Sequence, residues 1–213
     1  MINFIPVFPL DIVVYPGEAL NLHIFEDRYK ELVKECMADS KPFGIPSVQN
    51  QAVTEMGTLV EIREVVREYE DGCMDIRTTG TRVFRILEIL KTVPDKKYQA
   101  AIVSYPENDT RKNSLFMQAI FSRVLELHRL LQVTRDFKRP PEELLSYDLA
   151  HHAGLSPEEE YELLELLTEN QRLEYLRRHL KKIIPLVAGT ENLKEKIKLN
   201  GHFKELKGFD FDL

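Results

Sequence analysis

His23 and Glu26 are close in sequence and could do chemistry together. They lie in the stretch from Val7 to Tyr29, which reads VFPLDIVVYPGEALNLHIFEDRY. An imidazole beside a carboxylate can transfer protons or bind a metal ion, but a metal site usually needs three or four converging ligands, more than this pair offers. We therefore expect a structural histidine, and keep as an alternative a hydrolase that uses the His23/Glu26 region. The other histidines are His128, His151, His152, His179 and His202.

Short motifs for nucleophilic catalysis and phosphate binding are absent from the sequence. It contains no G-x-S-x-G elbow and no loop of the form G-x-x-x-x-G-K-[ST] or G-x-G-x-x-G. Cys36 and Cys73 are far apart and form no C-x-x-C pair, so neither zinc binding nor a disulfide framework is indicated. We predict a cytoplasmic protein that is not an enzyme and has no catalytic residues, metal or cofactor.

The charge balance argues against a nucleic-acid partner. The chain carries 29 Lys and Arg against 35 Asp and Glu, a formal net charge of -6. Binding to phosphates depends on cationic side chains, and the lysines near the C-terminal end alternate with glutamates, as on a solvated helix face. No stretch approaches the ~18 to 20 apolar residues of a membrane span. We expect neither nucleic acid nor membrane as a partner, with RNA binding as a less favoured alternative.

The first half of the chain predicts short strands and one helix. Tyr15-Pro16-Gly17-Glu18 fits a type II turn, and residues 20–24 alternate apolar and polar side chains as in a half-buried strand. Residues 29–37 have the apolar spacing of an amphipathic helix. Residues 57–69 and 73–79 flank a Glu-Asp-Gly turn, which indicates a hairpin. These elements favour a small barrel or closed sheet.

The second half predicts helices, because the composition changes near residue 108 to long runs of Leu, Glu, Lys and Arg. Ser156, Pro157 and Glu159 form the pattern of a capping box with proline at the first helical position. Leucines and isoleucines from 163 to 184 then keep near-heptad spacing, which is typical of a bundle helix or of half a coiled coil. We predict a barrel over residues 1–108, a helical bundle over 109–188, and a short terminal helix and tail over 189–213.

A long composite pattern runs through the barrel segment. It begins with PVFPLDIVVYPGEALNLHIFEDRYKELV and continues through FGI, EMGTLVEI and EDGCMDIRTTGTRVFRI. These segments resemble the N-terminal substrate-binding domain of Lon-type ATP-dependent proteases, and the likeness extends through the helical half to about residue 184. The residues that keep the family pattern are Pro9, Leu10, Pro16, Gly17, His23, Ile24, Phe25, Glu26, Arg28 and Tyr29, then Gly57, Thr58, Asp71, Gly72, Gly80, Arg82 and Phe84.

The resemblance implies an α+β fold, a PUA-like β pseudobarrel with one helix followed by a C-terminal α-helical bundle. It implies a protein- or peptide-binding module that recruits or presents unfolded or tagged polypeptides. The family's ATPase and protease motifs are missing from this sequence, so we expect hydrolysis of neither ATP nor peptides. Expected partners are polypeptide clients or a separate protease or chaperone. A homodimer is a further option, because periodicity cannot decide whether the long helix packs on its own bundle or on another copy.

Four residues at the junction between the predicted strand and helix are the candidate peptide- or partner-binding residues: Phe25, Glu26, Arg28 and Tyr29. We expect Glu26 and Arg28 to cap the helix or to pair with each other, and Phe25 and Tyr29 to pack the helix onto the barrel. Leu20, Leu22 and Ile24 are expected to fill the barrel.

Overall fold

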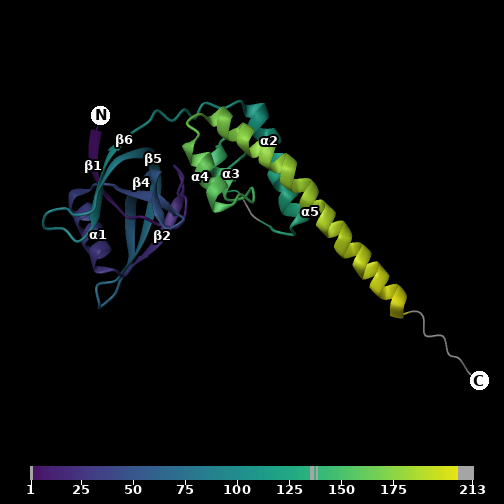
Figure 1. Cartoon of the computed structure of the whole chain (residues 1–213), viewed down its shortest axis with the longest axis horizontal. Helices are drawn as coiled ribbons and strands as arrows, with labels where there is room; N and C mark the ends of the chain where they lie inside the picture. The colour runs from purple at the N-terminus through teal and green to yellow at the C-terminus, as the bar shows by residue number, and fades with distance from the viewer. Residues whose placement is uncertain (1, 135–136, 138, 206–213) are drawn as a thin grey trace, which may run out of the picture.

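The computed structural model describes residues 2–134, 137 and 139–205, with a strand-rich part followed by a helical part (Figure 1). The strands are β1 (Ile2–Val7), β2 (Ala19–Ile24), β3 (Phe43–Gln49), β4 (Ala52–Glu68), β5 (Met74–Leu90) and β6 (Gln99–Ser104). The helices are α1 (Asp27–Asp39), α2 (Ser114–Leu130), α3 (Ser146–Ala150), α4 (Pro157–Glu165) and α5 (Glu169–Glu205). The change from strands to helices therefore falls between β6 and α2. No helix in the described part of the chain is both long and apolar enough to cross a bilayer.

The long strand β5 closes the sheet into a barrel. The strand order is β2-β5-β4-β3-β1-β6, and β5 also pairs with β6. Strands β5, β4, β3, β1 and β6 thus form a ring, while β2 pairs with the first half of β5 outside that ring. This barrel and the helices after it give the predicted α+β fold, a PUA-like pseudobarrel followed by a helical bundle.

Helix α1 covers one side of the barrel because its apolar side chains recur on one face. Its buried residues are Tyr29, Leu32, Val33 and Cys36. The Tyr29 ring stacks on Phe8 with 3.8 Å between the ring centroids. Within β2 the predicted alternation holds, since Ile24 is buried and Leu20 and Leu22 are partly buried against the same core.

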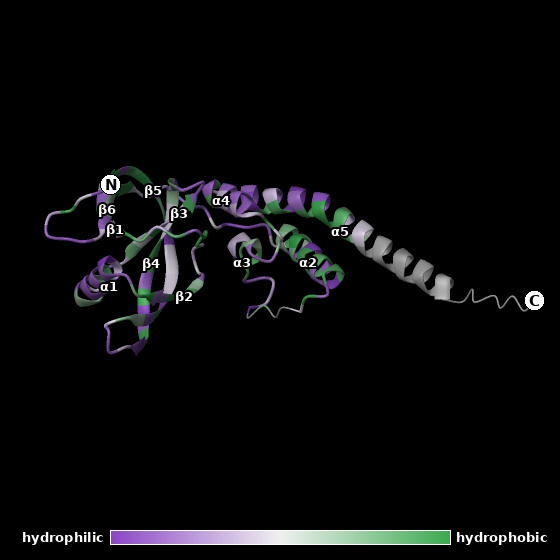
Figure 2. Cartoon of the chain, turned by 60° about the horizontal axis from the view of Figure 1, so that its bottom comes forward, coloured by the Kyte–Doolittle hydropathy of each residue, from purple (hydrophilic) through white to green (hydrophobic). Residues whose placement is uncertain are grey.

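The helical part is built on a leucine seam. Leu173, Leu176, Leu180 and Ile184 of α5 belong to one core cluster with residues of α2. Figure 2 shows hydrophobic residues in green along α2 and along the part of α5 beside it. The predicted capping box also forms at the start of α4, where Ser156 Oγ accepts from the backbone N–H of Glu159 and Glu159 Oε2 accepts from that of Ser156.

The prediction of a separate short helix from residue 189 is wrong, because α5 runs without a break through Pro185 to Glu205. Proline removes one helical hydrogen bond, that to the carbonyl four residues earlier. Pro185 and Lys181 are both exposed, so water can satisfy the Lys181 carbonyl and the helix continues. Residues 206–213 of the predicted tail lie outside the described residues.

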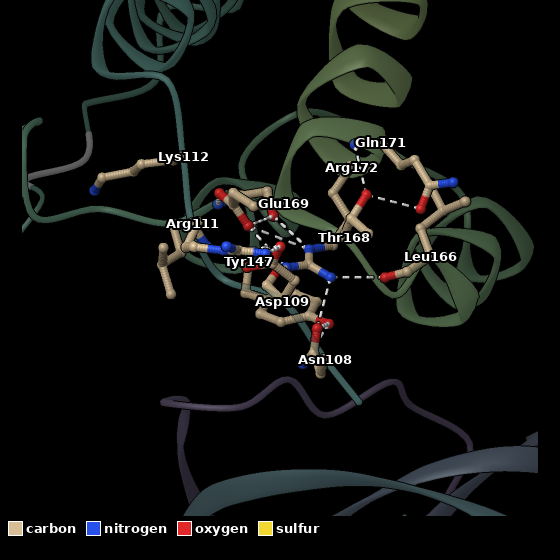
Figure 3. A network of polar contacts seen from close by, with 12 residues as sticks. Asn108, Asp109, Arg111, Lys112, Tyr147, Leu166, Thr168, Glu169, Gln171 and Arg172 are labelled. Carbon is tan, nitrogen blue, oxygen red and sulfur yellow. Dashed lines mark hydrogen bonds and ion pairs between the residues drawn. The ribbon is translucent and has the colours of Figure 1, made fainter. Parts of the chain in front are cut away.

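A buried arginine fixes the connection between barrel and bundle (Figure 3). The Arg172 side chain is fully buried and lies 4.2 Å from the centre of the Tyr147 ring. Its two terminal nitrogens donate to four oxygens: Asn108 Oδ1, Leu166 O, Asp109 O and Glu169 Oε2. Because Asn108 and Asp109 follow β6 and Glu169 begins α5, this one side chain ties the linker to the start of the long helix.

Candidate functional site

Strand β2 offers an open edge at the end of the sheet. Among the described strands it pairs only with β5, from Ala19 opposite Thr79 to Ile24 opposite Met74. The backbone N–H and C=O groups on its other side therefore face away from the sheet. An unpaired edge of this kind is a template for an added strand.

The register of β2 and β5 places a histidine opposite an aspartate. His23 and Asp75 are direct partners across the pair, and His23 Nδ1 lies 2.6 Å from Asp75 Oδ1. The second carboxylate oxygen of Asp75 accepts from the Tyr69 hydroxyl at 2.7 Å. One carboxylate thus orients two rings, that of His23 in β2 and that of Tyr69 directly after β4.

Three rings gather at this place and form what we call the aromatic patch, His23, Phe25 and Tyr69. Phe25 follows β2 directly and is 62% exposed. Its ring is roughly parallel to the His23 ring, with 6.1 Å between centroids, and the Tyr69 ring lies nearly perpendicular to the His23 ring, with 5.8 Å between centroids. The Arg67 guanidinium lies 4.5 Å from the centre of the Tyr69 ring, so the patch has a cation at its border.

A shallow hollow of about 330 Å³ adjoins the aromatic patch. Its lining residues come from three strands: Asn21, Leu22 and His23 of β2, Val66 of β4, and Asp75, Ile76 and Arg77 of β5. Val66 is 56% exposed because the register of β4 against β5 shifts there, with Val65 opposite Ile76 and Arg67 opposite Asp75. The extra residue in such a bulge is unpaired, which explains the apolar side chain on this outer face.

The electrostatics of the patch hold Asp75 in its charged form. Hydrogen bonds from His23 and then Tyr69 keep the pKa of the Asp75 carboxyl below its usual range. The same contact raises the pKa of the Tyr69 hydroxyl, because the proton is shared with a carboxylate. The Asp75 carboxylate therefore holds the His23 and Tyr69 rings in place. Phe25 is the apolar ring of the patch and is largely exposed.

The four candidate residues at the junction divide into two groups. Glu26 is the N-cap residue of α1 but caps without its side chain, which instead accepts from Arg28 Nε at 2.8 Å, so the predicted pairing is confirmed. The expectation that Phe25 packs α1 onto the barrel is wrong, because its ring faces solvent. Tyr29 does pack there, is 7% exposed, and lies beneath the Arg28 guanidinium at 4.5 Å.

His23 and Glu26 do not form the imidazole–carboxylate pair that their closeness in the sequence suggests. His23 contacts Asp75, whereas Glu26 contacts Arg28, so the two do not form a pair. Within the described residues, no group of three or more His, Cys, Asp or Glu side chains could hold a metal ion. Cys73 directly precedes β5, and its hydrogen bond to Asp71 raises the pKa of its thiol, which disfavours the reactive thiolate.

A second polar cluster joins the barrel to the bundle. His151 Nδ1 lies 2.7 Å from Glu160 of α4, and its Nε2 lies 3.2 Å from Glu18 of the turn before β2. The Tyr15 hydroxyl donates to the backbone carbonyl of Glu160 at 2.8 Å. The His151 ring nitrogens and the Tyr15 hydroxyl thus find their partners within the chain, which indicates a structural role at the junction.

Comparison with known proteins assigns the chain to a family. A model of the ATP-dependent protease La (LON) substrate-binding domain matches residues 5–182. The chain belongs to the Lon substrate-binding domain family. The Lon protease of Escherichia coli K12 is 22% identical over 214 aligned positions, and a Lon protease of Shigella dysenteriae matches equally. These alignments cover 91% of this chain but 26% of each relative, so the chain spans about a quarter of the Lon proteases it matches.

Solved structures with the same fold are also Lon N-terminal domains. The Lon N-terminal domain protein from Xanthomonas campestris is 27% identical, with a TM-score of 0.62 over 83% of this chain and 98% of that chain. The N-terminal domain of Lon protease from the Mycobacterium avium complex is 17% identical, with a TM-score of 0.59 over 84% and 99% of the two chains. The Lon-like resemblance of the sequence is thereby confirmed.

Sequence reasoning did not find Val66, Tyr69 or Asp75, although it did single out Phe25. No local motif marks the missing residues. Asp75 becomes recognisable only when β2 is paired with β5 in the right register, and Val66 only when the bulge in β4 is known. A one-residue change of register would turn the same side chains to the other face.

Proposed function

We propose that this chain is a polypeptide-binding module of the Lon substrate-binding type. It captures extended, apolar-rich segments of unfolded or tagged polypeptides and recruits or presents them to a separate protease or chaperone. It binds its clients without hydrolysing them, in the cytoplasm. The family membership supports the general role, and the surface around β2 supports the place of binding.

The observation that carries the proposal is the exposed Phe25 ring at the end of an open strand edge. A solvent-facing phenylalanine costs free energy, since burying such a side chain is worth about 1.5 to 3 kcal/mol. Here it stands on a fixed support, because Asp75 orients His23 and His23 stacks against Phe25. A rigid apolar anchor loses little entropy when it binds a partner.

The geometry favours a client in the extended conformation. A segment that pairs with the outer edge of β2 gains main-chain hydrogen bonds, which do not depend on its sequence. Its alternate side chains point to one face of the sheet. On that face the hollow beside Val66 and the aromatic patch can accept apolar or aromatic groups. Such binding tolerates many sequences but selects chains that are unfolded.

A peptide titration tests this function. The probe is a fluorescein-labelled peptide of twelve residues that alternates Val or Phe with Ser or Lys, and the readout is fluorescence anisotropy with the full chain. We expect micromolar binding, and we expect Phe25→Ala to weaken it about tenfold through lost apolar contact. Replacing the pairing residues of the peptide with proline should abolish binding, because proline removes the main-chain donors.

Leu87→Ala is the matched control, since Leu87 is a similarly exposed apolar residue of β5 outside the aromatic patch. It should leave the affinity unchanged. Absence of binding to any unfolded peptide at micromolar concentrations would refute the proposed function. Binding that is equally strong in Phe25→Ala would refute the assigned surface and leave the general role in place.

A further inference from the structure

An apolar groove lies between the two long helices of the bundle, away from the aromatic patch. It has a volume of about 530 Å³ and is lined by residues of α2 and of the middle of α5. Its apolar lining is formed by Phe116, Ala119 and Ile120 of α2 and by Leu180, Ile184 and Pro185 of α5. Leu115 and Leu186, which are next in sequence to the groove residues Phe116 and Pro185, are 78% and 63% exposed. The groove thus offers apolar contact on an otherwise charged pair of helices.

Three cations border this groove, Arg123 of α2 and Arg177 and Lys181 of α5. Arg123 pairs with Glu126 and Arg177 with Glu174, but both are exposed pairs within one helix, which hold their partners weakly. Lys181 has no ion pair among the residues that the structure describes. The border therefore favours a ligand that carries carboxylates beside apolar groups.

The chain itself contains a segment of this composition. Residues 208–213 read GFDFDL, which alternates two phenylalanines with two aspartates and adds a leucine. We propose that this segment of one copy binds in the groove between α2 and α5 of a second copy. Its phenylalanines contact the apolar lining, and Asp210 and Asp212 lie against the cations at the border.

The segment that fills a groove must come from a second copy, because it lies too far from the groove of its own chain. Pro185 is the groove residue nearest to the end of α5, and it lies about 30 Å from Glu205 at the rise of an α-helix. Phe211 follows Glu205 by six residues. A fully extended chain of that length spans at most about 21 Å. The segment cannot return to the groove of its own chain while α5 is intact. Two copies can exchange segments and close a symmetric dimer, or one copy can bind the next in a chain.

Peptide binding tests the contact directly. The probe is fluorescein-labelled GFDFDL, and the acceptor is the full-length Phe209→Ser/Phe211→Ser variant, whose own segment cannot compete. We expect saturable binding that weakens with added salt, because exposed charges are screened. The peptides GSDSDL and GFNFNL should each bind at least about tenfold more weakly, since one lacks the apolar groups and the other the charges.

A substitution inside the groove has a close control. Ala119 is an exposed groove residue, and Ala119→Glu places a carboxylate there without disturbing the helix. Gln118 is the exposed neighbour outside the groove lining, so Gln118→Glu adds the same charge elsewhere. Ala119→Glu should abolish peptide binding and Gln118→Glu should preserve it. Equal binding by both variants would overturn the assigned groove.

Complementation between two defective variants tests self-association. In size-exclusion chromatography with light scattering, the full chain should form dimers or larger assemblies as its concentration rises. Ala119→Glu, which keeps the segment, and Phe209→Ser/Phe211→Ser, which keeps the groove, should each remain monomeric alone. Mixed together they should form a one-to-one complex. Association of Phe209→Ser/Phe211→Ser with itself, or no complex in the mixture, would overturn the proposal. Because Phe25 is untouched in both, client binding can succeed or fail independently.

Discussion

Arg172 and Glu169 form an ion pair 2.9 Å long in which neither side chain is exposed to solvent. Buried charges are costly unless every donor and acceptor finds a partner. Here Ser146 completes the set, because its hydroxyl donates to Glu169 and accepts from Arg172 Nε. The pair therefore acts as part of a network that connects the linker, α3 and α5.

Replacing the cation alone should destabilise the protein strongly. Arg172→Met leaves the Glu169 carboxylate buried without its counter-charge and removes the guanidinium donor of the Asn108 oxygen at 2.8 Å. Breaking a buried pair in this way costs about 3 to 5 kcal/mol. We expect a loss of that size in the free energy of unfolding, measured by urea denaturation with circular dichroism.

Two further variants check the cause. Arg178→Met removes a cation of the same helix whose pair with Glu174 is exposed, and it should leave the unfolding midpoint unchanged. Adding Glu169→Gln to Arg172→Met should recover part of the stability, because the uncompensated charge is then removed. A double variant that is less stable than Arg172→Met would contradict this account.

The junction between barrel and bundle should weaken as the pH rises. Burial disfavours the charged His151 imidazole, but the hydrogen bonds and charges of Glu160 and Glu18 outweigh it and raise its pKa to about 10. A histidine in the unfolded chain has a pKa near 6.5. Because the folded pKa is the higher one, the stabilisation is fully present below about pH 6.5 and is lost between there and about pH 10.

The measurement is the urea midpoint of the natural chain and of His151→Gln across pH 6 to 9.5. We expect the largest difference at the acid end and a steady decrease toward the alkaline end. Glu18→Gln removes one of the two anionic partners and should shift the decrease to lower pH. Parallel curves for the natural chain and His151→Gln would show that the imidazole charge does not contribute.

Gly80 should tolerate no side chain, because a Cβ atom there would lie 2.2 Å from the Tyr15 carbonyl oxygen. This close approach is where the turn before β2 meets β5, with Gly17 donating to the Gly80 carbonyl at 2.8 Å. We expect Gly80→Ala to cost about 1 to 3 kcal/mol in the free energy of unfolding, as overpacking does. Gly189→Ala is the control. It lies in α5 with no atom near its Cβ position, and it should not lower stability.

The features that sequence predicts best are those set by neighbours along the chain. The turn at Pro16-Gly17 appears with Gly17 at a φ of 86°, as a type II turn requires. The cap at Ser156 is equally local. The apolar face of α1 and the seam of α5 follow from periodicity, because one face of each helix must be buried.

The features that sequence could not give depend on contacts between distant segments. Phe25 lies in a stretch of aromatic and apolar residues, so the sequence predicts that it packs in the interior. Its exposure follows from the turn between β2 and α1, which directs Tyr29 inward and leaves Phe25 outside. The pairing of His23 with Asp75 depends on strand register, and the continuity of α5 through Pro185 depends on solvent access to one carbonyl.

Because α5 is unbroken, its C-terminal half projects from the rest of the molecule (Figure 1). From Pro185 the helix continues about 30 Å to Glu205, past the end of α2 (Figure 1). A dye or a fused protein attached after Glu205 is thus kept well apart from the open edge of β2. A polypeptide held at one end of the molecule and a macromolecule engaged at the other can be accommodated simultaneously.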